Sequence, residues 1–565
     1  MKQSKLLIPT LLEIPEEIDS RNYRLLLQAG FIRQVSSGIY MYLPLAVRVI
    51  KKIKAIIREE FAEIDGTELQ MPTLMPSKLM GLTDDLEDQG TFTTVDQNNQ
   101  NYVLGSNDIE FFLDLVQTEI HSHKQLPLNL YQIQTNYQDK VYPNSGLMGS
   151  REFTSCTSYS FHDSEKSLED FYRKYEQVYR KILTRCELEF KSVVGDSGLS
   201  NGKDTKEFIA LSEIGETTIC VSNQSDYAAN LDRATSLYTG KKSHATYVDL
   251  EEVATPNQKS VSELAHFLDV TPQKIIKSLL FIADDEPVLV LMRGDHELNL
   301  VKVKNFLGVK KLNPATNEEA ENLLGVGLDW IGPVHVSNIS IYADNYVADL
   351  VNAVAGANQE DAHYLHVNSN RDFEPKAYGD FRLIQEGDPS PDGSGELVFK
   401  KGIEVAKLLK VGTDYSENIE ATIENEEGQH TLVQIGSYQL NINRLLAAIV
   451  EQNSNEGTIT WPKAIAPFDL HLLQIDMRDD YQTRLTLEVE EAMRDSGYEV
   501  LVDDRKIHSD LKINEADLIG CPICITVGQK AFEGIVEVKI KKTGATLEVR
   551  KEELANTLSI LLTSE

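Results

Sequence analysis

Long apolar runs are missing from this sequence, and no stretch reaches the about 18 apolar residues that a membrane span needs. The first residues, MKQSKLLIPTLLEIPEEI, combine a short apolar run with early acidic residues, which does not fit a secretory signal peptide. Cysteine is scarce, and the one close pair, Cys521 and Cys524, has no second pair to complete a zinc site. A sparse, odd set of cysteines favours reduced thiols. We therefore expect a cytoplasmic protein with no membrane partner and no bound metal.

Basic residues are in the minority, with 55 Lys and Arg against 88 Asp and Glu, which gives a formal net charge of −33. A balance this acidic disfavours a protein that coats nucleic acid, and we expect no DNA partner. Local basic patches at 51–54, 173–185 and 539–542 leave room for RNA, although such runs are more often solvated helix faces or edge strands. Walker-type phosphate loops, HExxH and GxSxG are absent, and the twelve histidines form no cluster, so we expect no tightly bound cofactor.

The most informative stretch is 129–163, NLYQIQTNYQDKVYPNSGLMGSREFTSCTSYSFHD. Its first part alternates apolar and polar residues and is rich in strand formers, its centre holds proline, asparagine and glycine, and its end returns to aromatic residues. This order predicts an antiparallel hairpin with a long loop. An Arg-Glu pair at the start of the returning strand is suited to holding a phosphate-bearing ligand against a sheet.

Three segments of this hairpin, "YQIQT", "GSREF" and "YSFH", resemble motif 2 of the bacterial-type prolyl-tRNA synthetases, which are class II aminoacyl-tRNA synthetases. The segments "SSGIYMYLPLAVRVIKKI" and "LQMPTLMP" resemble motif 1 of that family, and QIGSYQLNINRLLAAIVEQ at 434–452 resembles motif 3. The resemblance covers essentially the whole chain. On composition alone, the motif 1 helix and the strand predicted over 66–76 would equally suit ordinary core packing.

The resemblance implies an α+β fold with a class II antiparallel catalytic sheet, an inserted α/β editing domain and a C-terminal α/β anticodon-binding domain. The order of predicted elements places the catalytic domain at 1–222 and 401–467, the editing domain at 223–400 and the anticodon-binding domain at 468–565. In the last of these, strands alternate with helices, which predicts a mixed five-stranded sheet.

The activity implied by the resemblance is that of a proline–tRNA ligase, which activates proline with ATP and Mg²⁺ as substrates, transfers it to tRNA(Pro) and hydrolyses mischarged Ala-tRNA(Pro). The family assembles as a homodimer through motif 1. Positions that match its synthetic site predict roles in catalysis for Arg151, Glu152 and Arg444, and in substrate binding for Asp108, Phe161, His162 and Ser437.

Several positions depart from the family pattern. The arginine that the family directs at the α-phosphate is replaced by Gln138, the nearby acid by Lys140, and the glutamate that pairs with the imino group of proline by Ile109. Gln439 and Asn441 replace two glycines of motif 3, and their side chains are expected to intrude on adenine. The remaining departures are Asn107 and Thr157. These changes leave an alternative open, a degenerate paralogue that cannot activate proline and keeps only editing or a tRNA-binding, regulatory role.

The inserted domain keeps the family pattern more closely. Lys277 stands where the family has its editing lysine, within IIKSLLFIAD, and RGDHELN at 293–299 matches a signature loop. A small pocket that admits an alanyl ester and excludes a prolyl one is the expected site. The residues predicted for it are Lys277, Asp295, His296, Gly332, Asp344 and His363. In the C-terminal domain, Arg505 matches the residue that contacts tRNA.

Overall fold

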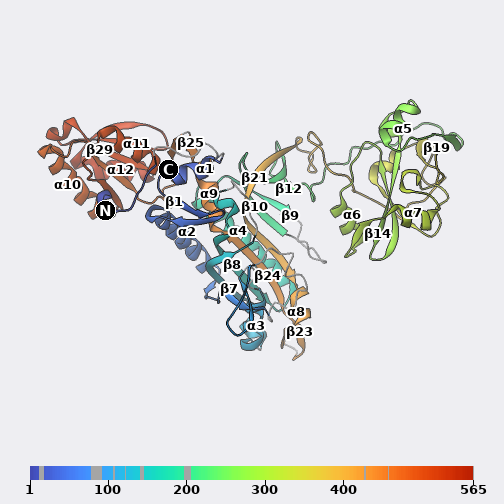
Figure 1. Cartoon of the computed structure of the whole chain (residues 1–565), viewed down its shortest axis with the longest axis horizontal. Helices are drawn as coiled ribbons and strands as arrows, with labels where there is room; N and C mark the ends of the chain where they lie inside the picture. The colour runs from blue at the N-terminus through green and yellow to red at the C-terminus, as the bar shows by residue number, and fades with distance from the viewer. Residues whose placement is uncertain are drawn as a thin grey trace. The chain divides into compact units, whose positions relative to one another are not determined.

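The computed structural model describes the chain except for residues 12–17, 19, 78–91, 106–108, 121, 140–145, 196–204, 425–427, 456 and 564–565. The described chain forms two compact units (Figure 1). The first contains Met1–Lys191, Glu207–Thr217 and Lys401–Glu565, and the second contains Ser192–Lys206 and Thr218–Lys400. No described helix is both long enough and apolar enough to cross a lipid bilayer.

The catalytic part of the first unit is built on an antiparallel sheet whose neighbouring strands run in the order β21, β24, β8, β7, with the short β3 added in parallel to β7. Its strands are β3 Thr67–Glu68, β7 Leu128–Tyr137, β8 Glu152–His162, β21 Leu397–Gly412 and β24 Gln434–Asn441. The hairpin predicted from the sequence is therefore the β7–β8 pair, which lies between β24 and β3 in this sheet.

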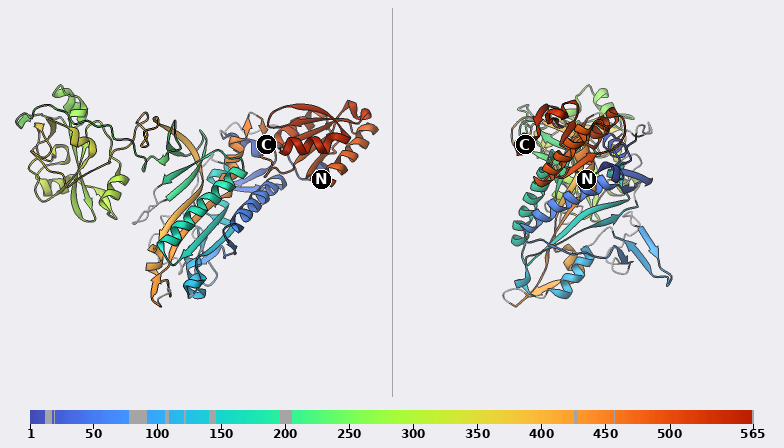
Figure 2. Two further views of the ribbon diagram at one scale, coloured as in Figure 1. Left: turned by 180° about the vertical axis from the view of Figure 1, so that it is seen from behind. Right: turned by 90° about the vertical axis from the view of Figure 1, so that its left-hand side faces the viewer.

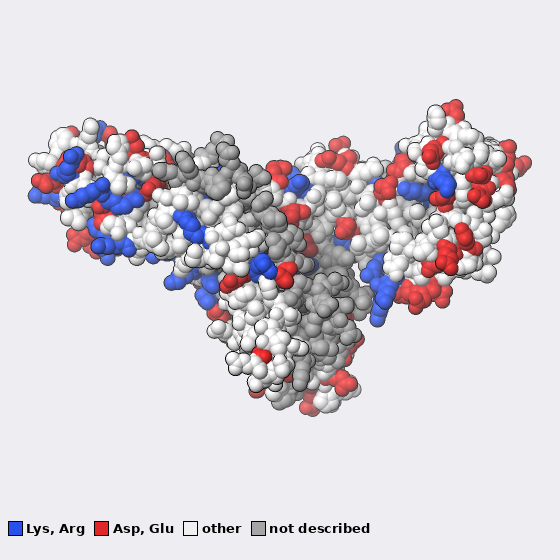
Figure 3. All heavy atoms as spheres, viewed as in Figure 1, with Lys and Arg blue, Asp and Glu red and all other residues white. Residues whose placement is uncertain are grey.

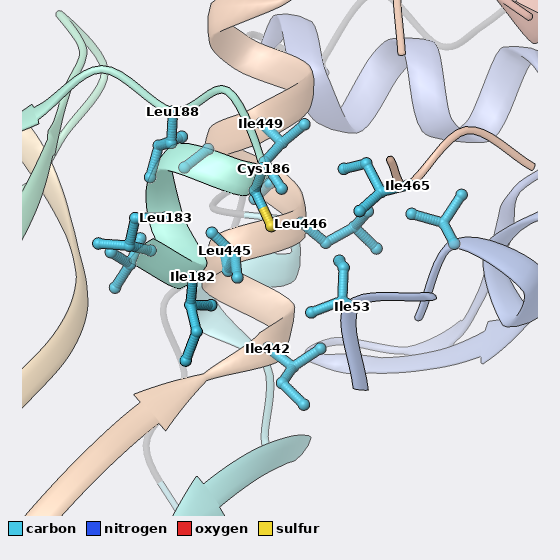
Figure 4. Packing of buried hydrophobic residues seen from close by; sticks show 14 of the residues in the cluster. Ile53, Ile182, Leu183, Cys186, Leu188, Ile442, Leu445, Leu446, Ile449 and Ile465 are labelled. Atoms are coloured by element: carbon cyan, nitrogen blue, oxygen red, sulfur yellow. The ribbon is translucent and has the colours of Figure 1, made fainter. Parts of the chain in front are cut away.

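Two long helices, α2 (Pro44–Ala62) and α4 (Glu165–Arg185), lie side by side on one face of the sheet (Figure 2). Proline at the first position of α2 fits a helix start, because the missing N–H has no intrahelical partner there. Ser164 caps α4 by accepting a hydrogen bond from the Ser167 amide. Apolar side chains of both helices pack with α9 (Ile442–Gln452) into the main core (Figure 4).

The opposite face of the sheet carries α3 (Ile109–Glu119) and a smaller apolar cluster that includes Tyr159 and Phe161 of β8. The segment 66–76 is not the single strand expected. It forms β3 and, after an irregular stretch that contains Pro72, β4 (Leu74–Pro76). Proline has no backbone N–H to donate to a sheet, which accounts for the break.

Shorter elements complete the catalytic part of the first unit. They are α1 Arg21–Gln28, β1 Ile32–Ser36, β2 Ile39–Tyr42, β5 Phe92–Val95, β6 Asn101–Leu104, β10 Thr205–Leu211, α8 Asp414–Asn418, β22 Thr422–Glu424, β23 His430–Leu432, β25 Ser454–Asn455 and β26 Thr458–Ile459.

The C-terminal domain of the first unit has a mixed five-stranded sheet, as predicted, in the order β28-β27-β29-β30-β31. The first three strands are parallel to one another, β30 is antiparallel to β29, and β31 is antiparallel to β30. Figure 3 shows basic and acidic side chains interspersed on the visible face of this domain. Its elements are β27 Leu470–Gln474, α10 Asp480–Asp495, β28 Val500–Asp503, α11 Ser509–Ile519, β29 Ile523–Val527, β30 Ile535–Ile540, β31 Thr546–Arg550 and α12 Lys551–Thr563.

The second unit is centred on a sheet of order β16-β14-β15-β17-β20 and a three-stranded sheet of order β13-β19-β18. Helices α5 and α7 each begin with a capping box, Ser260 with Glu263 and Thr316 with Glu319. Its elements are β11 Thr217–Ser222, β12 Ala228–Asn230, β13 Glu251–Ala254, α5 Val261–Phe267, β14 Ile276–Ala283, β15 Glu286–Arg293, α6 Leu300–Leu307, β16 Leu312–Pro314, α7 Asn317–Leu324, β17 Ser340–Asp344, β18 Ala353–Gly356, β19 Ala362–Val367 and β20 Ala377–Gly379. Strand β9, Phe190–Gly195, lies at the boundary of the two units.

Candidate functional sites

The β7–β8 hairpin positions Arg151 at the start of its second strand. The Arg151 guanidinium forms an ion pair with Asp139 and lies over the ring of Phe92, with Cζ 4.8 Å from the ring centroid. Gln138, which replaces the family's arginine, closes the hairpin instead: its backbone N–H donates to the Arg151 carbonyl (2.9 Å) and its amide to the Ser150 carbonyl (2.9 Å). Glu152 is exposed opposite Tyr137.

Arg444 reaches the same region from the first turn of α9. Its Nε donates to the Glu404 carbonyl at 2.5 Å, and its guanidinium forms an ion pair with Glu216. Two carboxyl side chains lie nearby on β10 and β21. Burial and the neighbouring charge of Glu207 raise the pKa of Glu404 to about 7, and Lys407 lies 3.5 Å from Glu207. The sequence motifs did not predict this acidic pair, although Glu404 in the strand-like run "GIEV" could have indicated a carboxylate on the sheet.

A row of neutral side chains crosses the sheet at Thr157, one of the positions that depart from the family pattern. Thr157 of β8 lies between Gln132 of β7 and Gln439 of β24 in register. Thr157 is buried, and Gln439 is exposed. Because side chains on a strand alternate between faces, Ser437 lies on the same face as Gln439.

Asn441 corrects an expectation. Its side chain was expected to intrude on adenine, but it caps α9, accepting a hydrogen bond from the Arg444 backbone N–H at 3.0 Å. Asparagine is a favoured N-cap residue, so it stabilises the helix that carries Arg444.

His162 is not brought to this face. Its ring is buried toward α4, with Nδ1 2.9 Å from the Ser167 hydroxyl and Nε2 2.8 Å from the Ser160 hydroxyl, and burial lowers its pKa to about 4. It lies five positions beyond Thr157 on an alternating strand, so it points to the other side of the sheet. In this structure His162 packs against α4, and its role in substrate binding stays a prediction.

Phe161 and Ile109 lie on the side of the sheet that carries Thr157, and both are buried in the apolar cluster with α3. Ile109 therefore offers no acceptor to a substrate. Three predicted positions, Asn107, Asp108 and Lys140, lie outside the described residues.

The second unit contains a cavity of about 170 Å³ lined by both Lys277 and His363. Lys277 comes from β14 and lies 3.7 Å from Glu297, and His363 comes from β19. The other lining residues are Gln258, Lys259, Ser260, Val261, Leu264, Ile275, Ile276, Ser278, Leu279, Leu328, Asp329, Ile331 and Gly356.

His363 is held from two sides. Its Nδ1 lies 2.6 Å from the Thr255 hydroxyl, and its ring meets the Trp330 ring edge-to-face at 5.7 Å. Burial lowers the pKa of His363 to about 4, so the imidazole is neutral at physiological pH. Thr255 was not among the predicted residues, and only its place just before a proline at a strand end distinguished it.

Gly332 does not line the cavity itself but packs against the backbone of Gly356, which does. A Cβ at Gly332 would lie 1.8 Å from the Gly356 carbonyl oxygen, so no other residue fits without a backbone shift. Asn358 fixes this approach by accepting from the Gly332 N–H at 2.8 Å and donating to the Val334 carbonyl at 2.9 Å.

Asp295, His296 and Asp344 do not line the cavity. Arg293 binds Asp295 through two hydrogen bonds (2.6 and 2.9 Å) and lies 2.7 Å from His296 Nε2. Burial, with the charge of Arg293, lowers the pKa of His296 to about 4. Asp344 is buried and accepts from the Tyr346 and Phe381 N–H groups at 3.0 and 2.9 Å. These residues brace the loops beside the cavity.

Arg505 of the C-terminal domain is held by carboxylates. It donates to Asp503 at 2.9 and 2.6 Å and lies 2.6 Å from Glu515. Fully buried Lys512 donates to the Gln474 and Asp503 carbonyls at 2.7 and 3.4 Å. The side chains directly after Arg505 line an open cavity of about 430 Å³ at the carboxyl ends of the parallel strands. This cavity is lined by Ile475, Asp476, Met477, Arg478, Lys506, Ile507, His508 and Ser509.

Comparison with known families assigns two of these regions. Residues 255–373 match the family model described as the aminoacyl-tRNA editing domain, and residues 469–560 match that of the anticodon binding domain. A relative from Latilactobacillus sakei subsp. sakei (strain 23K), named proline–tRNA ligase, is 48% identical over 574 residues and is covered in full, as is this chain. A relative of the same name from Listeria monocytogenes serovar 1/2a is 46% identical over 99% of both chains.

The fold also matches a solved structure, that of prolyl-tRNA synthetase from Cryptosporidium parvum complexed with L-proline and AMP. The TM-score is 0.58 at 11% identity, with 96% of this chain and 75% of that chain covered. At this identity the likeness concerns the fold alone, and it confirms the predicted fold class.

Proposed function

The chain belongs to the proline–tRNA ligase family of aminoacyl-tRNA synthetases and carries an aminoacyl-tRNA editing domain, and from this premise we propose how its two sites work. The proposal rests on a sequence identity of about 47% to curated proline–tRNA ligases along the entire chain. Nothing in the comparisons favours the alternative of a degenerate paralogue.

In the synthetic site, a carboxylate oxygen of proline attacks the α-phosphorus of ATP, and the bond to pyrophosphate breaks. Negative charge develops on the phosphoryl oxygens, and preorganised cations aimed at such charge are usually the largest catalytic contribution. We assign this role to Arg151 and Arg444, which reach the site from β8 and α9 and whose guanidinium groups match phosphate geometry. Glu152 lies at the hairpin mouth, and Ser437 on the face beside Gln439.

ATP enters as its Mg²⁺ complex. Carboxylate oxygens are the protein ligands that Mg²⁺ prefers. Glu207 and Glu404 fit this preference, because the charge of one raises the pKa of the other and a divalent cation would relieve that repulsion.

The editing site then hydrolyses the ester of mischarged Ala-tRNA(Pro) with water as the nucleophile. Lys277 supplies a cation at the cavity wall for the RNA 3′ end, and neutral His363 orients a polar group of the substrate. Gly332 supports the cavity wall by packing against the backbone of Gly356. Asp295, His296 and Asp344 hold the loops beside the cavity in place.

Three further assignments complete the proposal. The C-terminal domain binds tRNA(Pro), with Arg505 held in place by Asp503 and Glu515. Two chains form a homodimer through the motif 1 region, which exposes Val35 and Met41. The protein works in the cytoplasm, in keeping with five cysteines that are all free.

Proline-dependent ATP–pyrophosphate exchange on the purified protein tests the ligase, with deacylation of Ala-tRNA(Pro) run alongside. We expect both activities. Arg444→Lys, which keeps the charge and loses the planar fork, should reduce exchange and spare deacylation, and Lys277→Met should do the reverse. Deacylation without exchange would support an editing-only paralogue and refute the ligase proposal.

A further inference from the structure

The amide of Gln134, in the middle of β7, is buried without a partner. Its side chain is 8% exposed, and within the part of the chain that the structure describes neither Oε1 nor Nε2 makes a hydrogen bond. Asn136, two residues further along, is 6% exposed, and its Oδ1 is likewise without a partner. Folded proteins pair more than about 90% of buried polar groups, so two such residues side by side point to a ligand.

Both side chains lie on the face of the sheet that carries Thr157. Gln134 is in register with Ser155, and Asn136 with Phe153, so all five residues alternate onto one side. The Asn136 amide nitrogen donates to the Ser155 hydroxyl at 2.6 Å, which orients Oδ1 and leaves it available.

The resemblance places the carboxylate that the family uses for the imino group of proline at position 109. Ile109 occupies that position and is buried in an apolar cluster. The protonated imino group carries two N–H donors and needs acceptors. The Cβ atoms of Gln134 and Asn136 are about 7 Å apart along the strand, a span that two amide side chains can bridge around one nitrogen.

We propose that the amide oxygens of Gln134 and Asn136 accept the two N–H groups of proline, in place of the missing carboxylate, while Gln134 Nε2 donates to the substrate carboxyl group. The inference rests on the proposed function and names how this site holds its amino acid. Neutral acceptors bind a cation less strongly than a carboxylate does, so proline binding should be weaker than a glutamate would allow.

The test is Gln134→Met, which keeps the length and removes both hydrogen-bonding atoms, beside Gln134→Glu, which restores a carboxylate. Pyrophosphate exchange gives KM for proline and for ATP separately. We expect Gln134→Met to raise KM for proline at least tenfold with KM for ATP within about twofold, and Gln134→Glu to lower KM for proline. A non-hydrolysable prolyl-adenylate analogue should raise the Tm of the wild type more than that of Gln134→Met.

The Tm of the ligand-free protein separates binding from a structural role. Gln134→Met breaks no hydrogen bond, so its Tm should equal or exceed that of the wild type. Thr486→Val on α10 is the matched control, because the Thr486 hydroxyl is also buried and unpartnered, and it should leave both KM values unchanged. An unchanged KM for proline, or a lowered Tm with losses in every parameter, overturns the inference. A wild type with neither exchange nor analogue binding would instead overturn the proposed function, and the inference with it.

Discussion

The protonation state of His363 can be measured through a reporter built into the second unit. The chain has two tryptophans, and Trp330 meets His363 edge-to-face at 5.7 Å, whereas Trp461 belongs to the core of the first unit. Burial lowers the pKa of His363 to about 4 from an ordinary value of 6.5. That difference corresponds to about 3.4 kcal/mol against the charged form. At pH 6 about 1% of His363 should be protonated, against about three-quarters of an ordinary histidine.

The assay is ¹⁹F NMR of protein labelled with 5-fluorotryptophan, which gives one resonance for each tryptophan, assigned with a Trp330→Phe variant. We expect the Trp330 resonance to hold its position from pH 8 to about pH 5 and to move only below that. The Trp461 resonance reports any unfolding of the first unit in the same sample. His363→Gln should abolish the movement.

A Trp330 shift with a midpoint near pH 6.5 would refute the argument, since it would mean that the cavity does not exclude the charged imidazole. The same pKa carries a stability prediction. A histidine whose folded pKa is lowered contributes stability that is complete above 6.5 and is lost as the pH falls from 6.5 through 4. Editing by a neutral His363 should therefore show no acid limb between pH 8 and 6 from this residue.

Three further predictions follow from buried groups. Gly332→Ala should destabilise the second unit by about 1–3 kcal/mol and reduce deacylation, because the new Cβ would lie 1.8 Å from a backbone carbonyl oxygen. Gly327→Ala is the control: its Cβ would lie 3.5 Å from a side-chain atom, so this variant should have the Tm and the deacylation rate of the wild type. Asp503→Asn should destabilise the C-terminal domain by about 3–5 kcal/mol in urea unfolding, because it removes the buried carboxylate that pairs with Arg505 and lies 4.0 Å from the fully buried Lys512, and an unchanged midpoint would contradict this. Glu404→Gln should raise Tm at pH 8 and leave it unchanged at pH 4, because a carboxyl whose folded pKa is raised to about 7 destabilises the fold only once the pH exceeds its unfolded pKa.

The regular elements could be predicted because their periodicity is local. The alternation over 129–137 reappears as β7 (Leu128–Tyr137), and the run 434–452, which indicates a strand followed by an amphipathic helix, forms β24 and α9. The orientation of His162 was also available, since an odd spacing from Thr157 on one strand places two side chains on opposite faces. The motif predicts substrate binding for His162, whereas the alternation along the strand places its side chain on the face opposite Thr157.

Other features of the site depend on contacts between distant segments. The close approach of Gly332 to Gly356 and the ion pair of Arg444 with Glu216 join residues that no local pattern links. Asn441 is an intermediate case. An asparagine at a strand-to-helix junction predicts an N-cap, and Asn441 has this role. The glycine-rich motif predicts only that a side chain is present where the family has none.

Arg151 and Arg444, which we assign to the synthetic site, can still bind a negatively charged ligand although Gln138 replaces an arginine of the family. Arg151 pairs with Asp139 and Arg444 with Glu216, and each carboxylate is 49% exposed. Exposed ion pairs contribute about 0–1 kcal/mol, so giving them up costs little. A guanidinium donates hydrogen bonds to carboxylate and phosphate oxygens in the same planar geometry, so a phosphate can take the place of each acid. We therefore propose that the replacement of an arginine by Gln138 removes one phosphate contact and leaves two others, from Arg151 and Arg444, which is compatible with ATP-dependent chemistry.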